Sequence, residues 1–270
     1  MANCREPCRV SRHAIIALER TPPVEDSLAA ALRVAASVGL LEIELQTRRR
    51  NRVNGFLRLR RDGLYRYCPT GLRELSAIYP AAAHTALNVP PVHLEGSAFA
   101  NLNDDEARAL LSEADTMFLA SFAPGPDGRP AMGISHRGGK PGFTRIDKDG
   151  GLTIPCFFGN LLFNTLVNIL LTATAGLVVP CFASGDVLLI TGEARGGLGD
   201  DDDVEAGPAG AERVWQIRPR QGRWLHGALP VELQLKSWSS QTLATGDWPR
   251  TPLSLSPSRP PQLQTEISNY

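Results

Sequence analysis

The stretch SHRGGKPGFTRIDKDGGLTIPCFFGNLLFNTLVN, residues 135–168, decides how the rest of the chain is interpreted. It joins a basic, glycine-rich turn to a short hairpin and then to a Gly-Asn step that opens a helix. Glycines let backbone N–H groups approach an oxyanion, and the first turn of a helix leaves N–H groups that can donate to an anion. The stretch therefore predicts a phosphate-binding segment.

The basic turn holds His136, Arg137 and Lys140 around a pair of glycines. Arg137 can bind a phosphate through two parallel hydrogen bonds, whereas Lys140 acts as a compact point charge. Taken alone, a basic glycine-rich turn indicates an exposed loop more often than a site. For His136, a structural role or a phosphate contact is favoured over proton donation. No nucleophile–base pair and no pair of carboxylates stands out, so the sequence assigns no catalytic residue.

Asn160, Asn164 and Asn168 recur at every fourth residue and share one face of the helix predicted over residues 161–171. Asparagine is a poor residue for a helix interior, although Asn160 suits the N-cap. The asparagines either contact a ligand or hydrogen-bond to neighbouring backbone, and for Asn168 both interpretations are open. We expect the apolar face of the helix to dock into the core through Leu161, Leu162, Leu166, Ile169 and Leu170.

Short apolar runs separated by turn-forming residues surround this stretch and predict strands. The expected strands span residues 116–122, 131–135, 143–146, 152–155, 176–179, 187–194, 214–218 and 231–238. A helix that begins near Asn103, with acidic residues in its first turn, precedes them. The pattern predicts a mainly β fold with a few helices, built as a small β-barrel.

The N-terminal part shows weaker patterns and no obvious internal repeat. A helix is predicted over residues 26–36, and strands are predicted near residues 41–45 and 53–59. The basic run Arg48–Arg52 indicates a solvated strand end or a local anion contact more than a nucleic-acid patch. Residues 68–101 are rich in proline and predict an irregular linker with a weak helix over residues 71–78.

The 28 basic and 28 acidic residues cancel, so the composition predicts neither a nucleic-acid partner nor an anionic membrane surface. Five scattered cysteines fit reduced intracellular thiols better than a disulfide framework, and no Cys/His set completes a metal site. The apolar run over residues 161–180 is interrupted by asparagines and is too broken for a membrane span. We expect a cytoplasmic protein without a bound metal.

Several motifs, in their order along the chain, resemble those of the pyridoxamine 5′-phosphate oxidase-like, FMN-binding split-barrel family. They are SHRGGKPGF, GLTIP, GNLLFNTLVNI, AGLVV and SGDVLLITGEA. Their order and spacing over residues 115–194 are more specific than any one motif. Upstream, GLLEIELQTRRRNRVNG, residues 39–55, resembles a segment of the tandem members of this family, in which a degenerate first barrel precedes the second.

The resemblance implies a Greek-key, FMN-binding split β-barrel over residues 102–238 and the remnant of a first split-barrel domain over residues 26–67. The linker 68–101 would join them, and residues 1–25 and 239–270 would be disordered ends. The family also implies a homodimer, because an open flavin cleft needs a second wall. By position, the implied FMN-binding residues are Ser135, His136, Arg137, Lys140, Asn160, Asn164 and Thr165.

The resemblance further implies a flavin-dependent oxidoreductase, with a substrate that the sequence does not give. The chain departs from the tandem pattern ahead of residue 39 and again after Gly63, so the first barrel looks truncated. One alternative is therefore a non-catalytic paralogue that acts as a binding module. Another is a split barrel that binds haem or a deazaflavin.

Overall fold

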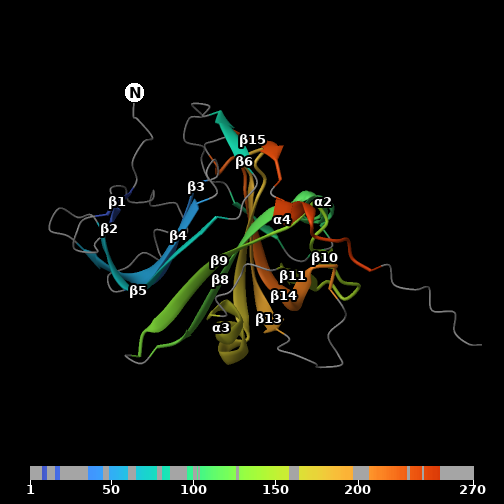
Figure 1. Cartoon of the computed structure of the whole chain (residues 1–270). Helices are drawn as coiled ribbons and strands as arrows, with labels where there is room; N and C mark the ends of the chain where they lie inside the picture. The colour runs from blue at the N-terminus through green and yellow to red at the C-terminus, as the bar shows by residue number, and fades with distance from the viewer. Residues whose placement is uncertain are drawn as a thin grey trace, which may run out of the picture.

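The structure, a computed structural model, describes most of the chain. The described residues are 8–10, 16–18, 36–44, 49–59, 65–77, 81–85, 96–99, 102, 104–125, 128–157, 164–196, 207–229, 232–238 and 240–249. Two antiparallel sheets form most of this part, a smaller N-terminal one and a larger C-terminal one (Figure 1). None of the helices among these residues is long and apolar enough to cross a membrane.

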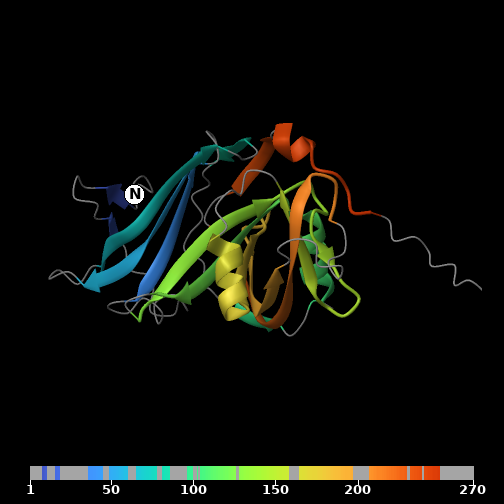
Figure 2. The same ribbon diagram turned by 60° about the horizontal axis from the view of Figure 1, so that its bottom comes forward.

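The larger sheet is eight-stranded, with the order β10-β11-β14-β13-β12-β8-β9 and with β7 paired to β14 off this path. Its strands are β7 (Gly96–Phe99), β8 (Thr116–Pro124), β9 (Pro130–Gly138), β10 (Arg145–Ile146), β11 (Leu152–Phe157), β12 (Thr174–Pro180), β13 (Val187–Gly196) and β14 (Ala211–Leu225). Figure 2 shows this sheet curling round its own interior, with α3 (Asn164–Thr172) lying against it. The expected fold class, a mainly β Greek-key split barrel with a few helices, is confirmed.

One apolar core fills the inside of the curled sheet. Successive residues of a strand face opposite sides, so every second residue of β8 faces inward, and Met117 and Leu119 are fully buried. On β14 the largest of the buried side chains, Trp215, is 1% exposed. Burial on this scale stabilises each large apolar side chain by about 1.5–3 kcal/mol relative to exposure.

Helix α2 (Asp105–Glu113) begins as the sequence predicted. Asp104 is its N-cap, and the Asp104 carboxylate accepts a hydrogen bond from the Ala107 N–H at 2.9 Å. The buried face of the helix carries Ala107 and Leu111, which join the core of the larger sheet.

Helix α3 confirms part of what the sequence predicted for residues 161–171. Leu166 and Ile169 are 3% and 1% exposed, as expected for core positions. The expectation for Leu170 was wrong, because its side chain is 51% exposed beside the exposed Val167 and Leu171. The residues at positions 165, 166, 168 and 169 are buried on one face of the helix. With 3.6 residues per turn, the residues at positions 167, 170 and 171 then lie on the opposite, exposed face. Leu161 and Leu162 lie outside the described residues.

The N-terminal sheet has the strand order β1-β2-β5-β4-β3. Its strands are β1 (Cys8–Val10), β2 (Ile16–Leu18), β3 (Ser37–Glu44), β4 (Arg49–Leu59) and β5 (Tyr65–Ala77). The weak helix predicted over residues 71–78 was wrong, because β5 pairs with β4 along nearly its whole length. Pairing between distant residues overrides weak local preferences, and strand propensity depends strongly on such context.

Further ordered elements lie in ranges that the sequence predicted to be irregular. The range 68–101 contains most of β5 together with β6 (Ala81–Thr85) and β7, and β6 pairs with β15 (Glu232–Ser237). Strands β1 and β2 lie within residues 1–25, and α4 (Ser240–Leu243) lies beyond residue 239. The Trp248 indole N–H donates to the Phe143 carbonyl at 3.0 Å, so this part of the chain packs on the barrel. Most of the helix predicted over residues 26–36 lies outside the described residues. The division into domains stays a prediction.

Candidate functional site

Strands β8 and β9 form the hairpin that carries the glycine-rich turn. Ser135 pairs with Leu119 and Arg137 pairs with Met117, so both side chains lie on the face of β9 that looks into the core. His136 lies on the opposite face, where its ring meets the Phe118 ring edge-on with centroids 5.8 Å apart. The three consecutive candidates are thus divided between the two sides of one strand.

The hydroxyl groups of Ser135 and Thr165 lie 3.1 Å apart, and both residues are buried. Three residues along α3, the Asn168 side-chain amide donates to the Ser121 hydroxyl at 3.1 Å. These two contacts fasten α3 to the β8–β9 hairpin by polar groups. The side-chain amide of Asn168 therefore hydrogen-bonds to a neighbouring side chain. The sequence had left two other partners open for Asn168, a ligand or the neighbouring backbone.

The contacts also fix the direction of α3 relative to β9. Asn168 lies next to Gly133, since a Cβ added at Gly133 would be 3.1 Å from the Asn168 amide nitrogen. Thr165 lies next to Ser135, two residues further along β9. Arg137 follows Ser135 by two residues on the same face of β9. We name the residues of this contact, Ser121, Ser135, Arg137, Thr165 and Asn168, the β9–α3 seam.

Arg137 is buried to 3% exposure, and its guanidinium donates a hydrogen bond to the His136 carbonyl at 3.0 Å. Its planar fork of several N–H donors matches the oxygens of a phosphate. The pairing of Ser135 with Thr165 uses only one hydroxyl proton, so the other hydroxyl can still donate. The donor set at this end of the seam therefore fits an oxyanion.

The glycines of the turn have a different role from the predicted one. The Gly139 N–H donates to the Asp115 carbonyl at 3.1 Å and is not turned toward a ligand. A Cβ at Gly138 would lie 2.6 Å from the Asp115 oxygen, and a Cβ at Gly139 would lie 2.6 Å from Cβ of Phe143. Both glycines therefore allow close packing of the turn on the barrel, and the expectation that they expose backbone N–H groups to an anion was wrong for Gly139.

The remaining predicted site residues are placed less closely. Lys140 is half-buried in the turn, where its carbonyl accepts from the Phe143 N–H at 2.9 Å. Asn164 is the first residue of α3, and its side chain lies outside the described part. Asn160 also lies outside the described residues. Among the described residues, no group of three His, Cys, Asp or Glu residues could hold a metal ion.

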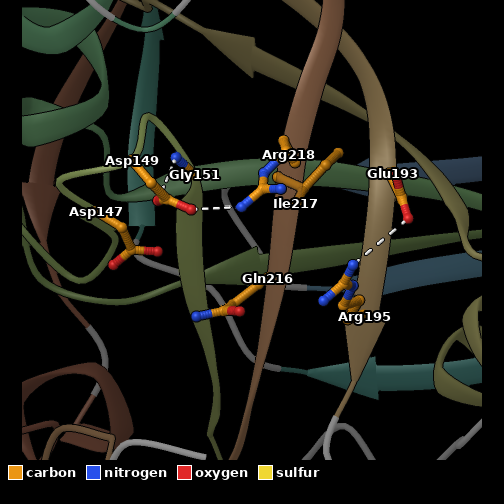
Figure 3. A pocket seen from close by; sticks show the side chains of 8 residues that line it. All are labelled: Asp147, Asp149, Gly151, Glu193, Arg195, Gln216, Ile217 and Arg218. Carbon is orange, nitrogen blue, oxygen red and sulfur yellow. Dashed lines mark hydrogen bonds and ion pairs between the residues drawn. The ribbon is translucent and has the colours of Figure 1, made fainter.

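A separate, shallow pocket lies on the outer surface of β13 and β14 and the turn before β11 (Figure 3). It is lined by Asp147, Asp149, Gly151, Glu193, Arg195, Gln216, Ile217 and Arg218. Its charges are paired: Arg218 donates to Asp149 at 2.5 Å, the charged groups of Arg195 and Glu193 lie 3.7 Å apart, and Asp147 accepts from Arg145 at 3.1 Å. Such exposed pairs contribute little to stability, and we assign no ligand to this pocket.

The ion pair of Arg218 with Asp149 gives a testable titration. The Arg218 guanidinium, followed by the Gly151 N–H, holds the pKa of the Asp149 carboxyl below its ordinary value. A lowered carboxyl pKa favours the folded state above the unfolded pKa, and this contribution is lost as the pH falls through the folded pKa. In Arg218→Ala the Asp149 pKa should rise toward its ordinary value in an NMR titration of the carboxyl carbon. An unchanged pKa would show that the pair does not persist in solution.

Comparison with known proteins gives distant matches only. No family model and no curated protein matches this chain. Among solved structures, HupZ of Group A Streptococcus is 11% identical, with 50% of this chain and 96% of HupZ covered and a TM-score of 0.31. A pyridoxamine 5′-phosphate oxidase-related, FMN-binding protein from Nostoc punctiforme is 14% identical, with 53% of this chain and 94% of that protein covered and a TM-score of 0.34. An FAD-binding protein from Mycobacterium smegmatis is 11% identical, with 47% of this chain and 99% of that protein covered and a TM-score of 0.29. At these TM-scores the matches say nothing of the ligand or the activity of this chain.

Proposed function

We propose that this protein binds FMN, with the phosphate at the end of the β9–α3 seam that carries Arg137. One observation carries the proposal: Arg137, only 3% exposed, shares a face of β9 with Ser135, whose hydroxyl lies 3.1 Å from the buried Thr165 hydroxyl of α3. Those groups favour a dianion over a neutral ligand. The order of the motifs over residues 115–194, which resembles the FMN-binding split barrels, supports FMN among phosphate-bearing ligands.

The residues of the chain would bind and orient the cofactor. Arg137 and the helix start would hold the phosphate, with Ser135, Thr165 and Asn164 as hydroxyl and amide donors and Lys140 as a charge at the rim. His136, on the other face of β9, would border the site without touching the phosphate. A bound flavin supplies redox chemistry by itself, and a flavin-dependent oxidoreductase is the activity that follows from this cofactor. Association into homodimers is part of the same proposal.

Visible absorption of the purified protein tests the ligand class. Apoprotein mixed with FMN and desalted should keep the absorption spectrum of a flavin. Parallel samples with haem and with a deazaflavin should lose their chromophores on desalting. Retention of haem or deazaflavin in place of FMN would overturn the choice of ligand, and a colourless protein in all three samples would indicate a binding module without a cofactor.

A further inference from the structure

Two tryptophans near the C-terminal end of the described chain reach back to the glycine-rich turn. The Trp238 indole N–H donates to the Asp115 carboxylate at 3.3 Å, and the Trp248 indole N–H donates to the Phe143 carbonyl at 3.0 Å. Helix α4 lies between the two tryptophans in the sequence, in the red segment of Figure 1. We name Trp238 together with residues 240–248 the C-terminal strap.

The two residues that accept from the strap are also the ones that fix the turn. The Asp115 carbonyl accepts from the Gly139 N–H at 3.1 Å, and the Phe143 N–H donates to the Lys140 carbonyl at 2.9 Å. Asp115 thus binds the turn through its backbone and the strap through its side chain. Phe143 binds the turn through its N–H and the strap through its carbonyl. The strap therefore contacts the turn at both of its ends.

Two further contacts dock the strap on the barrel. The Gly246 N–H donates to the Ala209 carbonyl at 2.8 Å, and a Cβ added at Gly246 would lie 2.6 Å from Cβ of Ala209. The Arg145 guanidinium, which follows the turn, lies 4.6 Å from the centre of the Trp248 ring in a favourable cation–π contact. The Trp248 ring thus has an apolar face against a cation and its N–H on the turn.

The strap docks on connections between elements and not on the strands of the core. Asp115 joins α2 to β8, Phe143 lies between β9 and β10, and Ala209 lies ahead of β14. Within the strap, the side chains of Ser240 and Leu243 are exposed. Segments held by partly exposed contacts open at a lower free energy than core strands do. Undocking of the strap therefore does not require unfolding of the barrel.

The turn depends on contacts of this kind for its order. Residues 138–142 include three glycines, so the backbone of the turn loses more freedom on ordering than an average segment. The turn begins one residue after Arg137 and carries Lys140, whose charge the proposed function puts at the rim of the phosphate. An ordered turn fixes where the Lys140 backbone lies, whereas a disordered one spreads the charge over many positions.

We propose that the C-terminal strap sets the affinity of the site for phosphate by holding the glycine-rich turn in the conformation that positions Lys140. This rests on the proposed function of the seam. Trp248 is then a positioning residue, since it acts on the ligand through the turn. The docked strap and the ligand favour the same conformation of the turn, so each stabilises the binding of the other.

The test compares Trp248→Phe with Leu243→Ala. Trp248→Phe keeps an aromatic ring beside Arg145 and removes the donor to the Phe143 carbonyl, whereas Leu243→Ala truncates an exposed side chain of the same strap. Quenching of flavin fluorescence follows the binding of FMN and of riboflavin. Trp248→Phe should weaken FMN binding about fivefold and leave riboflavin binding unchanged. Leu243→Ala should stay within about twofold of the wild type for both flavins.

A double-mutant cycle with Lys140→Ala separates positioning from a general loss of structure. If the strap acts through Lys140, Trp248→Phe should not weaken FMN binding further when Lys140 is already alanine. The same fold-loss with and without Lys140, an equal loss for riboflavin, or no loss of FMN binding in Trp248→Phe would each overturn the role of the strap. The proposed function would stand in all three cases.

Hydrogen exchange of the apoprotein tests the hold of the strap on the turn without a ligand. The Gly139 and Phe143 amides should exchange faster in Trp248→Phe than in the wild type, while the amides of β13 keep their wild-type rates. Unchanged exchange at the turn would overturn the inference by itself. If the wild type binds neither flavin, the proposed function is wrong and the effect on affinity falls with it, while faster exchange would still establish the hold on the turn. If Trp248→Phe does not fold, Trp238→Phe, which removes the donor to Asp115, must give the same results.

Discussion

Protein in which Arg137 and Lys140 are both changed to alanine should bind FMN about 2–5 kcal/mol more weakly than the wild type, because two charge-assisted phosphate contacts are lost. Riboflavin, which lacks the phosphate, should bind both proteins with equal affinity. Fluorescence titrations with the two flavins measure the difference directly. Most of the loss should come from Arg137, which is 3% exposed, since water screens the half-exposed Lys140 more strongly.

Two controls belong to this experiment. Lys148→Ala removes an exposed lysine from the turn before β11 and should leave FMN binding unchanged. Arg137→Gln keeps part of the side-chain volume and hydrogen bonding, so that weaker binding reflects the lost charge more than a cavity. An unchanged FMN dissociation constant in the double alanine variant would place the phosphate elsewhere in the molecule.

Gly192→Ala should lower the free energy of unfolding by about 3 kcal/mol, the largest effect on stability that we expect from a single added methyl group. A Cβ at Gly192 would overlap the carbonyl oxygen of Arg218 on the neighbouring strand and lie 2.8 Å from its carbonyl carbon. Backbone atoms in the middle of a sheet cannot move aside cheaply. Chemical denaturation followed by circular dichroism measures the change.

Gly176→Ala is the matched control for this substitution, because Gly176 lies on the adjacent strand β12. A Cβ there would meet its nearest neighbours, the Ile190 oxygen and Cβ of Ala120, at 3.7 Å and 3.8 Å, which are ordinary contacts. Its free energy of unfolding should therefore stay within about 0.5 kcal/mol of the wild type. Equal stability of the two variants would show that Gly192 does not pack against the Arg218 backbone at the register shift between Thr191 and Gly192.

Local sequence patterns were sufficient for most of the larger sheet. The strand predicted over residues 187–194 is β13 (Val187–Gly196), and the one predicted over 116–122 is β8 (Thr116–Pro124). Both segments are short, largely apolar runs next to turn-forming residues. β5 was missed because Pro69 and Gly71 interrupt its pattern, and only the partners on β4 reveal that both residues sit at a bulge.

The candidate site was predictable only in part. The resemblance assigned Ser135 and Thr165 to one site, and the structure brings their hydroxyls to 3.1 Å. The position of Arg52 against Gly133 of β9 was not predicted, because Arg52 comes from a different sheet, far upstream in the chain.

Titration of the wild-type apoprotein with FMN, followed by the quenching of flavin fluorescence, tests the central claim most directly. The account predicts saturable quenching that ends at one FMN per chain, and weaker binding of riboflavin, because riboflavin cannot use the buried Arg137 and the N-terminus of α3. Flavin fluorescence that stays unquenched at stoichiometric protein, or equal affinities for FMN and riboflavin, would contradict it.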